Sequence, residues 1–149
     1  MTHAAFETPL GAGSPLLRGT ISAAVHEHGG VSPTTIIRTD TPASVHIKWR
    51  LEGPLASMIC GKWHVHVNLE SIGPGREYSL FDRDCQLDLN PGGDGNYECH
   101  FDIPPGTVRA AHQGTPYKMV VTLTYRDPTG RPGPMAAYYE GPILQFFNP

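Results

Sequence analysis

The sequence predicts an all-β domain built as an antiparallel β-sandwich, and three features of the chain support this prediction. Polar and apolar residues alternate over segments of eight or nine residues, which is typical of strands with one buried face. The 17 glycines and 15 prolines gather between these segments, where short strands meet tight turns. No long segment repeats its apolar residues with the helical period, so alternating strands and helices are not expected.

Two segments give the clearest strands, and each carries one of the two tryptophans. In residues 44–52 one face is apolar and consists of Val45, Ile47, Trp49 and Leu51. In residues 62–70 the apolar face consists of Trp63, Val65, Val67 and Leu69. Strict alternation of this kind indicates half-buried antiparallel strands.

The other strands are predicted from shorter runs. Weaker candidates lie at residues 17–25 and 34–38, and a strong one lies at 117–125. Residues 84–89 and 97–103 flank a turn rich in Gly, Asn and Pro, so they are expected to pair as a hairpin. Two further strands are expected at residues 135–140 and 143–147. A set of about seven to nine strands suits one sandwich.

The chain of 149 residues is long enough for one domain with its own core. Residues 1–16 are small and aperiodic, so we expect a flexible N-terminal arm before a single domain over residues 17–149. The net charge of −3 gives no reason to expect nucleic acid as a partner, and insertion into a membrane is not expected either. A classical signal-peptide pattern is absent, so the protein is expected to be cytoplasmic or exported as part of an assembly.

The three cysteines are too few for a disulfide framework. Cys85 and Cys99 fall on the inward face of the predicted hairpin, where a disulfide is geometrically possible. Reduced thiols that behave as small apolar side chains are the simpler interpretation.

One part of the chain resembles a known family. The segment Pro104-Pro-Gly-Thr-Val, followed by a strand that Tyr117 opens, is similar to the E–F corner of immunoglobulin-like and fibronectin type III-like bacterial domains. The resemblance implies an immunoglobulin-like antiparallel β-sandwich with Trp49 and Trp63 on strands B and C. The Cys…Trp…Cys arrangement of antibody domains is missing, because Cys60 lies only three residues before Trp63. The resemblance therefore implies a fold and no functional residue.

Histidines are the candidates for a metal site. His64 and His66 lie two positions apart on one strand face, and two such imidazoles can share a zinc ion. His46 would be a third ligand if its strand formed a direct hairpin with theirs. In the immunoglobulin-like order the two strands lie in different sheets, so His46 cannot be the third ligand. Histidines on a solvated or partner-facing sheet are therefore the favoured interpretation, and no cofactor is expected.

Acidic and amide side chains near the turn at residues 90–95 are a second candidate for an ion: Asp82, Asp84, Asp88, Asn90 and Asp94. They do not follow the EF-hand pattern, and turns favour Asp and Asn for reasons of backbone geometry. A structural role in the turn is therefore the preferred interpretation.

The C-terminal segment carries two adjacent aromatic pairs, Tyr138 with Tyr139 and Phe146 with Phe147. Strand alternation places one member of each pair outward, while Ile143, Phe146 or Phe147 is expected to complete the core. Exposed aromatic residues on an edge strand suit contact with a protein partner or with a second copy of the chain, for example by strand addition.

These features predict a non-catalytic structural or protein-interaction module that acts as a subunit of a larger oligomeric assembly. The expected contact residues are Tyr138, Tyr139, Phe146, Phe147, His64 and His66. Two alternatives remain open: a small-molecule or carbohydrate-binding sandwich, and a metal-binding protein that uses His64 and His66. An enzyme is not expected, because the chain has no Gly-x-Ser-x-Gly elbow and no local Cys–His–acid set.

Overall fold

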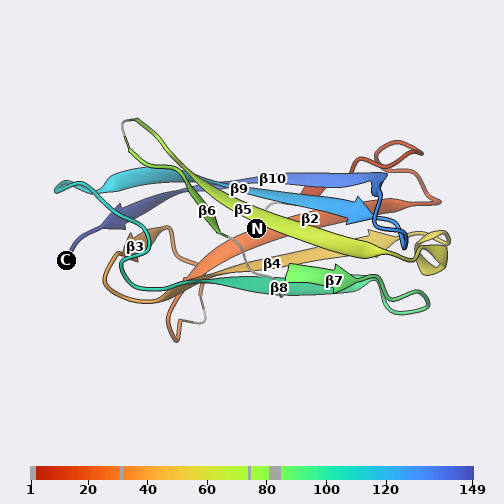
Figure 1. Ribbon diagram of the computed structural model, residues 1–149, viewed down its shortest axis with the longest axis horizontal. Helices are drawn as coiled ribbons and strands as arrows, with labels where there is room; N and C mark the ends of the chain where they lie inside the picture. The colour runs from red at the N-terminus through yellow and green to blue at the C-terminus, as the bar shows by residue number, and fades with distance from the viewer. Residues whose placement is uncertain (1–2, 31, 74, 81–84) are drawn as a thin grey trace.

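The computed structural model describes residues 3–30, 32–73, 75–80 and 85–149, which fold into two packed β-sheets (Figure 1). The strands are β1 (Ala4–Ala5), β2 (Arg18–Glu27), β3 (Ile36–Arg38), β4 (Ala43–Glu52), β5 (Lys62–Ser71), β6 (Tyr78–Leu80), β7 (Gln86–Asp88), β8 (Asn96–Ile103), β9 (Thr115–Arg126) and β10 (Pro132–Phe147). A 3-10 helical turn, η1 (Ala56–Met58), joins β4 to β5. In the described part of the chain, no helix has the length and apolar character needed to cross a membrane.

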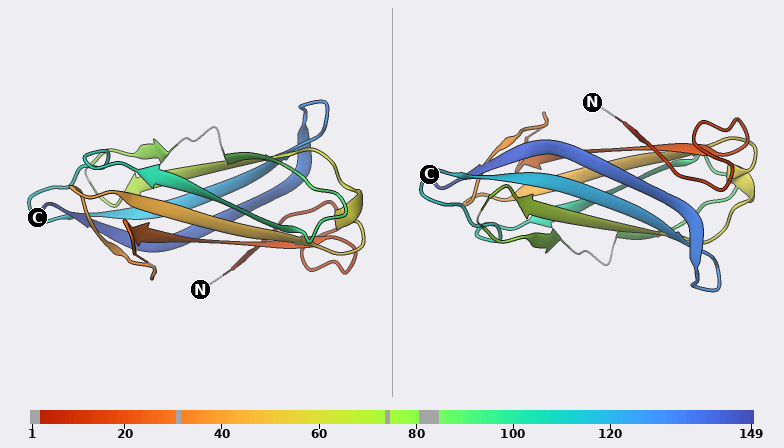
Figure 2. Two further views of the ribbon diagram at one scale, coloured as in Figure 1. Left: turned by 90° about the horizontal axis from the view of Figure 1, so that it is seen from below. Right: turned by 90° about the horizontal axis from the view of Figure 1, so that it is seen from above.

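Sheet A has the strand order β1-β2-β4-β8, and sheet B has the order β3-β10-β9-β5-β6, with β7 also paired to β5. Neighbouring strands are antiparallel except β3 and β10, which are parallel. In immunoglobulin terms, β2, β4 and β8 occupy the places of strands A, B and E, and β10, β9 and β5 those of G, F and C. The chain is therefore an immunoglobulin-like β-sandwich, as predicted. Figure 2 shows it from two opposite sides, with β10 in front in the right-hand view.

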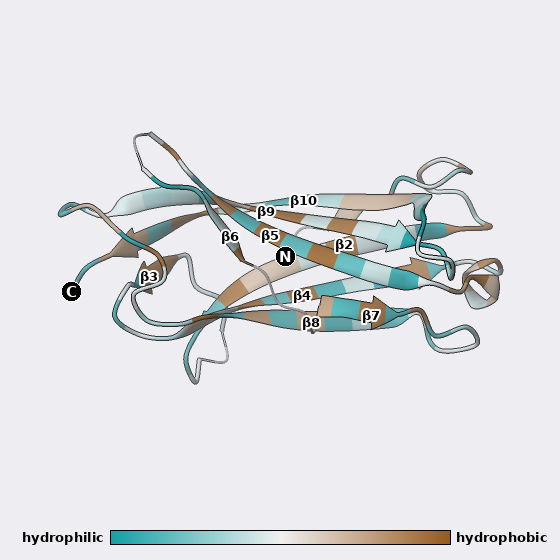
Figure 3. Cartoon of the chain, viewed as in Figure 1, coloured by the Kyte–Doolittle hydropathy of each residue, from teal (hydrophilic) through white to brown (hydrophobic). Residues whose placement is uncertain are grey.

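The core lies between the sheets and is built by strand alternation. Every second side chain of β4 and β5 is buried, which produces the alternating bands of hydropathy in Figure 3. Trp49 of β4 and Trp63 of β5 are 2% and 0% exposed, and their rings meet edge to face with centroids 6.3 Å apart. Because the two strands belong to different sheets, this contact joins the two layers. The resemblance had placed these tryptophans on strands B and C, and the structure agrees.

Tyr117 is the third residue of β9 and anchors the loop that precedes this strand. Its hydroxyl donates a hydrogen bond to the carbonyl O of Arg109 at 2.7 Å, while the backbone N–H of Arg109 donates to the Tyr78 hydroxyl at 3.1 Å. A tyrosine that bonds back to an upstream backbone group is typical of the E–F corner of this fold. Burial, aided by Tyr78, raises the pKa of Tyr117 to about 12, so the phenol stays protonated as a donor.

The predicted N-terminal arm is packed onto the sandwich over part of its length. Residues Ala4–Ala5 pair with β2, and the backbone of Glu7 exchanges two hydrogen bonds with β10. Phe6 lies between them with 1% exposure, and its ring meets Trp63 edge to face at a centroid distance of 5.8 Å. Burying such a ring contributes about 1.5–3 kcal/mol, which offsets the entropy lost in ordering the chain. The prediction of a free arm is therefore wrong for residues 4–7.

The predicted hairpin between residues 84–89 and 97–103 does not form. β7 pairs with β5 in sheet B, whereas β8 pairs with β4 in sheet A, so residues 89–95 cross between the sheets. Backbone hydrogen bonds fix this path, because Leu89 donates to Gly61 next to β5 and Leu51 of β4 donates to Gly95. Residue 84 itself lies outside the described residues. Cys85 is a buried thiol, and its Sγ lies 3.6 Å from the carbonyl O of His100.

β10 is one continuous strand where the sequence predicted two. Between Glu140 and Ile143 it holds one residue more than β9 does opposite, which is a β-bulge. The extra residue reverses the alternation of inward and outward side chains. For this reason Tyr139 and Phe146 are both buried, and Ile143, which the sequence placed among the candidate core residues, is 57% exposed.

Replacing Tyr117 with Phe should lower the free energy of unfolding by about 0.5–1.5 kcal/mol, because it removes the hydrogen bond that the buried phenol donates to the carbonyl of Arg109. Denaturant titration measures this change. Tyr138→Phe is the matched control, since Tyr138 is 54% exposed, and it should change stability by less than about 0.5 kcal/mol. Equal losses in the two variants would contradict the role of the Tyr117 hydroxyl.

Replacing Phe6 with Ala should destabilise the protein by about 3–5 kcal/mol, the usual loss for a buried Phe. Thermal and denaturant unfolding measure the effect. Leu10→Ala alters the same segment at a side chain that is 48% exposed and should have little effect. A Phe6→Ala variant as stable as Leu10→Ala would show that the N-terminal segment does not support the sandwich.

Candidate interaction surface

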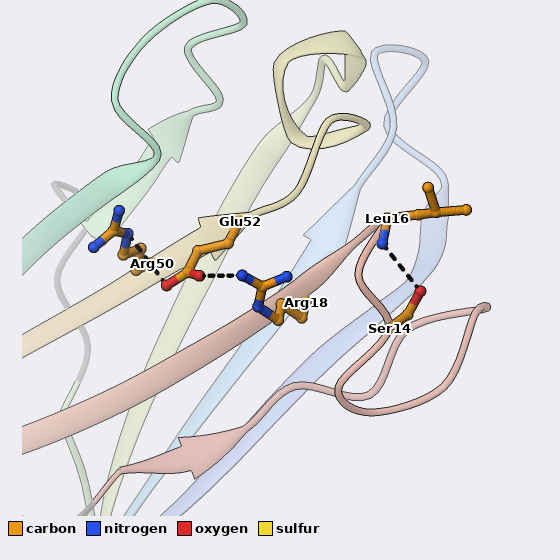
Figure 4. Close-up of polar contacts among 5 residues, drawn as sticks. All are labelled: Ser14, Leu16, Arg18, Arg50 and Glu52. Carbon is orange, nitrogen blue, oxygen red and sulfur yellow. Dashed lines mark hydrogen bonds and ion pairs between the residues drawn. The ribbon is translucent and has the colours of Figure 1, made fainter.

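The outer face of sheet A carries ion pairs at the end where β2 begins. Glu52 accepts a hydrogen bond from Arg18 at 2.9 Å, and its other carboxylate oxygen lies 3.3 Å from Nε of Arg50 (Figure 4). In the loop before β2, the hydroxyl of Ser14 accepts the backbone N–H of Leu16 at 3.2 Å. Such exposed pairs stabilise a fold by at most about 1 kcal/mol. This part of the surface is therefore polar and internally paired.

The outer face of sheet B brings together two features that lie far apart in the sequence. His66 of β5, Thr122 of β9 and Tyr138 of β10 are successive partners in one row across the sheet. The next row contains His64 and Thr124 in the same relation. The predicted histidine pair and one of the predicted aromatic residues thus share a single face.

Large apolar side chains are exposed on the same face. Tyr138 is 54% exposed and Ile143 is 57% exposed. Ile36 of β3 is 61% exposed and lies opposite Gln145 of β10, on the side away from the core. We refer to these residues together as the sheet B patch: Ile36, His64, His66, Tyr138 and Ile143.

A charged pair lies within the patch. Glu140 follows Tyr138 on the outward side of β10, and its carboxylate forms an ion pair with the ammonium group of Lys118. The hydrogen bond that Lys118 donates to Glu140 raises the pKa of Lys118, and the negative charge of Glu140 contributes further. The patch therefore combines exposed apolar groups with a fixed pair of opposite charges.

The structure separates the four predicted aromatic contact residues into two groups. Tyr138 is exposed and Phe147 is half-buried, whereas Tyr139 and Phe146 are 4% and 1% exposed. The prediction that one member of each pair faces outward is confirmed. Tyr139 and Phe146 belong to the core and are not available to a partner of the folded chain.

β10 is not a free edge strand along its whole length, which corrects in part the expectation that the aromatic residues lie on an edge strand. β10 lies between β3 and β9 within sheet B. The side of β10 away from β9 pairs with β3 at residues 145–147 and bonds to Glu7 at Ala136. These contacts lie on either side of Tyr138 and not at it, so both the face of the sheet and strand addition next to Tyr138 are open to a partner.

The third predicted metal ligand lies on the other side of the sandwich. His46 is on β4 in sheet A, whereas His64 and His66 are on β5 in sheet B. Burial lowers the pKa of His46, and the positive charges of His26 and His100 lower it further. Among the described residues, no three His, Cys, Asp or Glu side chains stand in an arrangement that holds a metal ion.

The acidic residues near the turn at 90–95 have partners of their own. Asp94 accepts the backbone N–H of Asn96 at 2.9 Å, and Asp88 lies 3.9 Å from Nζ of Lys62. Asp82 and Asp84 lie outside the described residues. For Asp94 the structure shows the turn-forming contact that is usual for Asp in loops.

No family model matches the chain, and no curated protein matches its sequence. Solved structures do match it. The chain is similar to AggA, the major subunit of aggregative adherence fimbriae type I from Escherichia coli, with a TM-score of 0.46 and 9% identity over 88% of this chain and 95% of that chain. It is also similar to a Niemann-Pick type C2 protein from the Japanese carpenter ant, with a TM-score of 0.38 and 7% identity over 84% of this chain and 89% of that chain. These likenesses concern the fold alone.

Two members of the patch were not predicted, although the sequence holds a signal for each. Ile36 and Ile37 are adjacent in a strand, so they cannot both point into the core, and it is Ile37 that is buried. For Ile143 the signal is the Gly-Pro pair that precedes it within a strand pattern, which is typical of a β-bulge.

The imidazole of His64 should titrate below its ordinary pKa of 6.5, because burial disfavours the charged ring and the nearby cations Arg126, His66 and Lys62 add to this effect. A lowered folded-state pKa means that this contribution to stability is present above pH 6.5 and is lost as the pH falls through the folded value. NMR titration of the ring protons measures the midpoint. His64→Gln assigns the signal and should reduce the loss of stability on acidification. A midpoint at or above the ordinary value would contradict the expectation.

Proposed function

We propose that this chain is a non-catalytic protein-interaction module, a subunit of a larger assembly, and that the sheet B patch is its contact surface. The observation that carries the proposal is the grouping of Ile36, Tyr138 and Ile143, each more than half exposed, on the outer face of one sheet. Single exposed apolar residues are common on protein surfaces, but a group on one face is typical of an interaction site.

The chemistry of the patch suits a protein contact. Tyrosine is enriched at the centres of protein interfaces because it combines a large apolar ring with a polar hydroxyl. Tyr138 would be the tyrosine of this interface. His66 lies in the same row of the sheet, and the Lys118–Glu140 ion pair lies beside it. The apolar groups would supply buried area, and the polar groups would set the orientation of the partner.

The distribution of charge favours a second copy of the chain as the partner. At one end of the face Lys62 and Arg126 are direct cross-strand partners, and together they outnumber Asp88, which pairs with Lys62. At the other end Glu70 and Glu140 outnumber Lys118. A two-fold axis through the middle of the face would place the basic end of each copy against the acidic end of the other, as a self-complementary interface requires.

Analytical ultracentrifugation or light scattering at concentrations up to about 1 mM tests this proposal. The native chain should associate as its concentration rises, and Ile143→Asp should weaken the association at least about tenfold by placing a charge among apolar contacts. Met58→Asp is the matched control, because Met58 is 73% exposed and lies in η1 outside the patch.

Two results would contradict the proposal. One is a native chain that stays strictly monomeric over the whole concentration range. The other is an equal effect of Ile143→Asp and Met58→Asp, which would mean that association does not use the sheet B patch.

A further inference from the structure

Three histidines from distant parts of the sequence meet on the outer face of sheet A. His26 lies on β2, His46 on β4 and His100 on β8, which are neighbouring strands. The ring centroids of His26 and His46 are 4.5 Å apart, and those of His46 and His100 are 5.8 Å apart. We refer to these three side chains as the imidazole row, with His46 at its centre.

The register of the strands holds these rings next to one another. His46 and His100 are direct cross-strand partners. His26 lies opposite Ser44, so it is diagonal to His46 and within the reach of a long side chain. The hydroxyl of Ser44 lies 2.9 Å from Nε2 of His46, and this hydrogen bond fixes the central ring between the other two. A charge on one ring therefore acts on its neighbours at short range.

The row crosses from an inner strand of sheet A to its edge. β8 is the last strand in the order β1-β2-β4-β8, and it pairs with β4 over residues 96–103. By contrast, β9 lies between β10 and β5 within sheet B. A strand with one neighbour opens more readily than a strand that is paired on both sides. The contacts between β4 and β8 therefore determine how firmly β8 is held.

The charged and titratable groups around the row come from all three strands. They are Glu27 and His28 beside His26, Lys48 two positions after His46, and Glu98 and Asp102 on either side of His100. Glu98 lies directly opposite Lys48, and Asp102 lies opposite Ser44. The carboxylates thus lie near the outer rings, whereas the central ring has a lysine on its own strand. Burial lowers the pKa of His46, and the positive charges of its neighbours lower it further, against the opposite effect of Glu98.

We propose that the imidazole row is an acid-sensitive switch that controls the pairing of β4 with β8. At about pH 7.5 the rings are neutral and pack against one another without repulsion. As the pH falls toward about 5, protonation places like charges on the direct partners His46 and His100, an arrangement that destabilises a sheet. The charge of His26 adds a second repulsion along the diagonal.

The sign of the effect follows from the position of His46 in the row. A folded-state pKa below the ordinary value means that the contribution of this ring to stability is present above pH 6.5 and is lost as the pH falls through the folded value. β8 then opens from β4 more often, which exposes backbone groups of both strands to a partner. The switch lies on sheet A and does not depend on the proposed contact surface on sheet B.

Amide hydrogen exchange measured by NMR tests the proposal, once the rates are corrected for the intrinsic effect of pH on exchange. The amides of β8 that bond to β4 should lose protection relative to those of β9 by at least about fivefold between about pH 7.5 and about pH 5. The loss should shrink at high salt, because added ions screen the repulsion between exposed rings.

Two variants of the central ring separate charge from packing. His46→Gln stays neutral, so the protection of β8 should lose most of its dependence on pH. His46→Lys carries a charge at both pH values, so β8 should already be loosened at about pH 7.5. The matched control is the double variant His64→Gln/His66→Gln, which removes two imidazoles from sheet B and should keep the native acid response of β8.

Three results would overturn the proposal. The first is a native chain in which the protection of β8 relative to β9 is the same at both pH values. The second is a His46→Gln variant, shown to be folded by circular dichroism, that keeps the native acid response, because the loosening would then come from other groups. The third is a loss of that response in the double variant on sheet B.

Discussion

The burial of the two tryptophans between the sheets determines which side chains of β4 and β5 point inward. The side chains on the two outer faces follow from this choice. Trp49 and Trp63 meet between the sheets, and neither indole N–H has a hydrogen-bond partner among the described residues. Their stabilisation therefore comes from the burial of apolar area, which is large enough to tolerate unpaired donors. With Trp63 inward, His64 and His66 must point outward, because a shift of β5 by one residue would bury the imidazoles and expose the indole. The position of the histidines is thus a consequence of core packing.

The apolar part of the sheet B patch depends instead on a local irregularity. In a regular strand Tyr139 and Phe146 would point to opposite faces, because they are an odd number of residues apart. The bulge in β10 places both in the core, and it also turns Ile143 outward. A Cβ at Gly141 would lie 2.8 Å from the terminal methyl group of Met119, so a larger residue in the bulge would have to displace the end of that side chain. Pro142 needs no hydrogen-bond acceptor, since it has no N–H. A feature that a regular strand would hide in the core is therefore presented at the surface by one extra residue.

The strands and their buried faces were predictable from the sequence, whereas several of the contacts between segments were not. Alternation is a local property, so residues 44–52 and 62–70 reveal which side chains point inward without any knowledge of their neighbours. The turn at residues 90–95 has the same composition whether it closes a hairpin or crosses between sheets, so the separation of β7 from β8 could not be predicted. Phe6 is a single aromatic residue in an aperiodic segment, and its burial requires a gap between the sheets that no local pattern describes.

The outer faces of sheet A and sheet B carry different side chains, and the core separates the two faces. The sheet B patch offers apolar area next to charges of both signs, which suits a macromolecule with a matching face. The outer face of sheet A instead carries the imidazoles of His26, His46 and His100 and the ion pairs of Glu52 with Arg18 and Arg50. In a dimer formed through sheet B, the outer face of sheet A would point away from the partner in both copies. Association through sheet B would therefore leave the polar outer face of sheet A exposed to solvent in both copies.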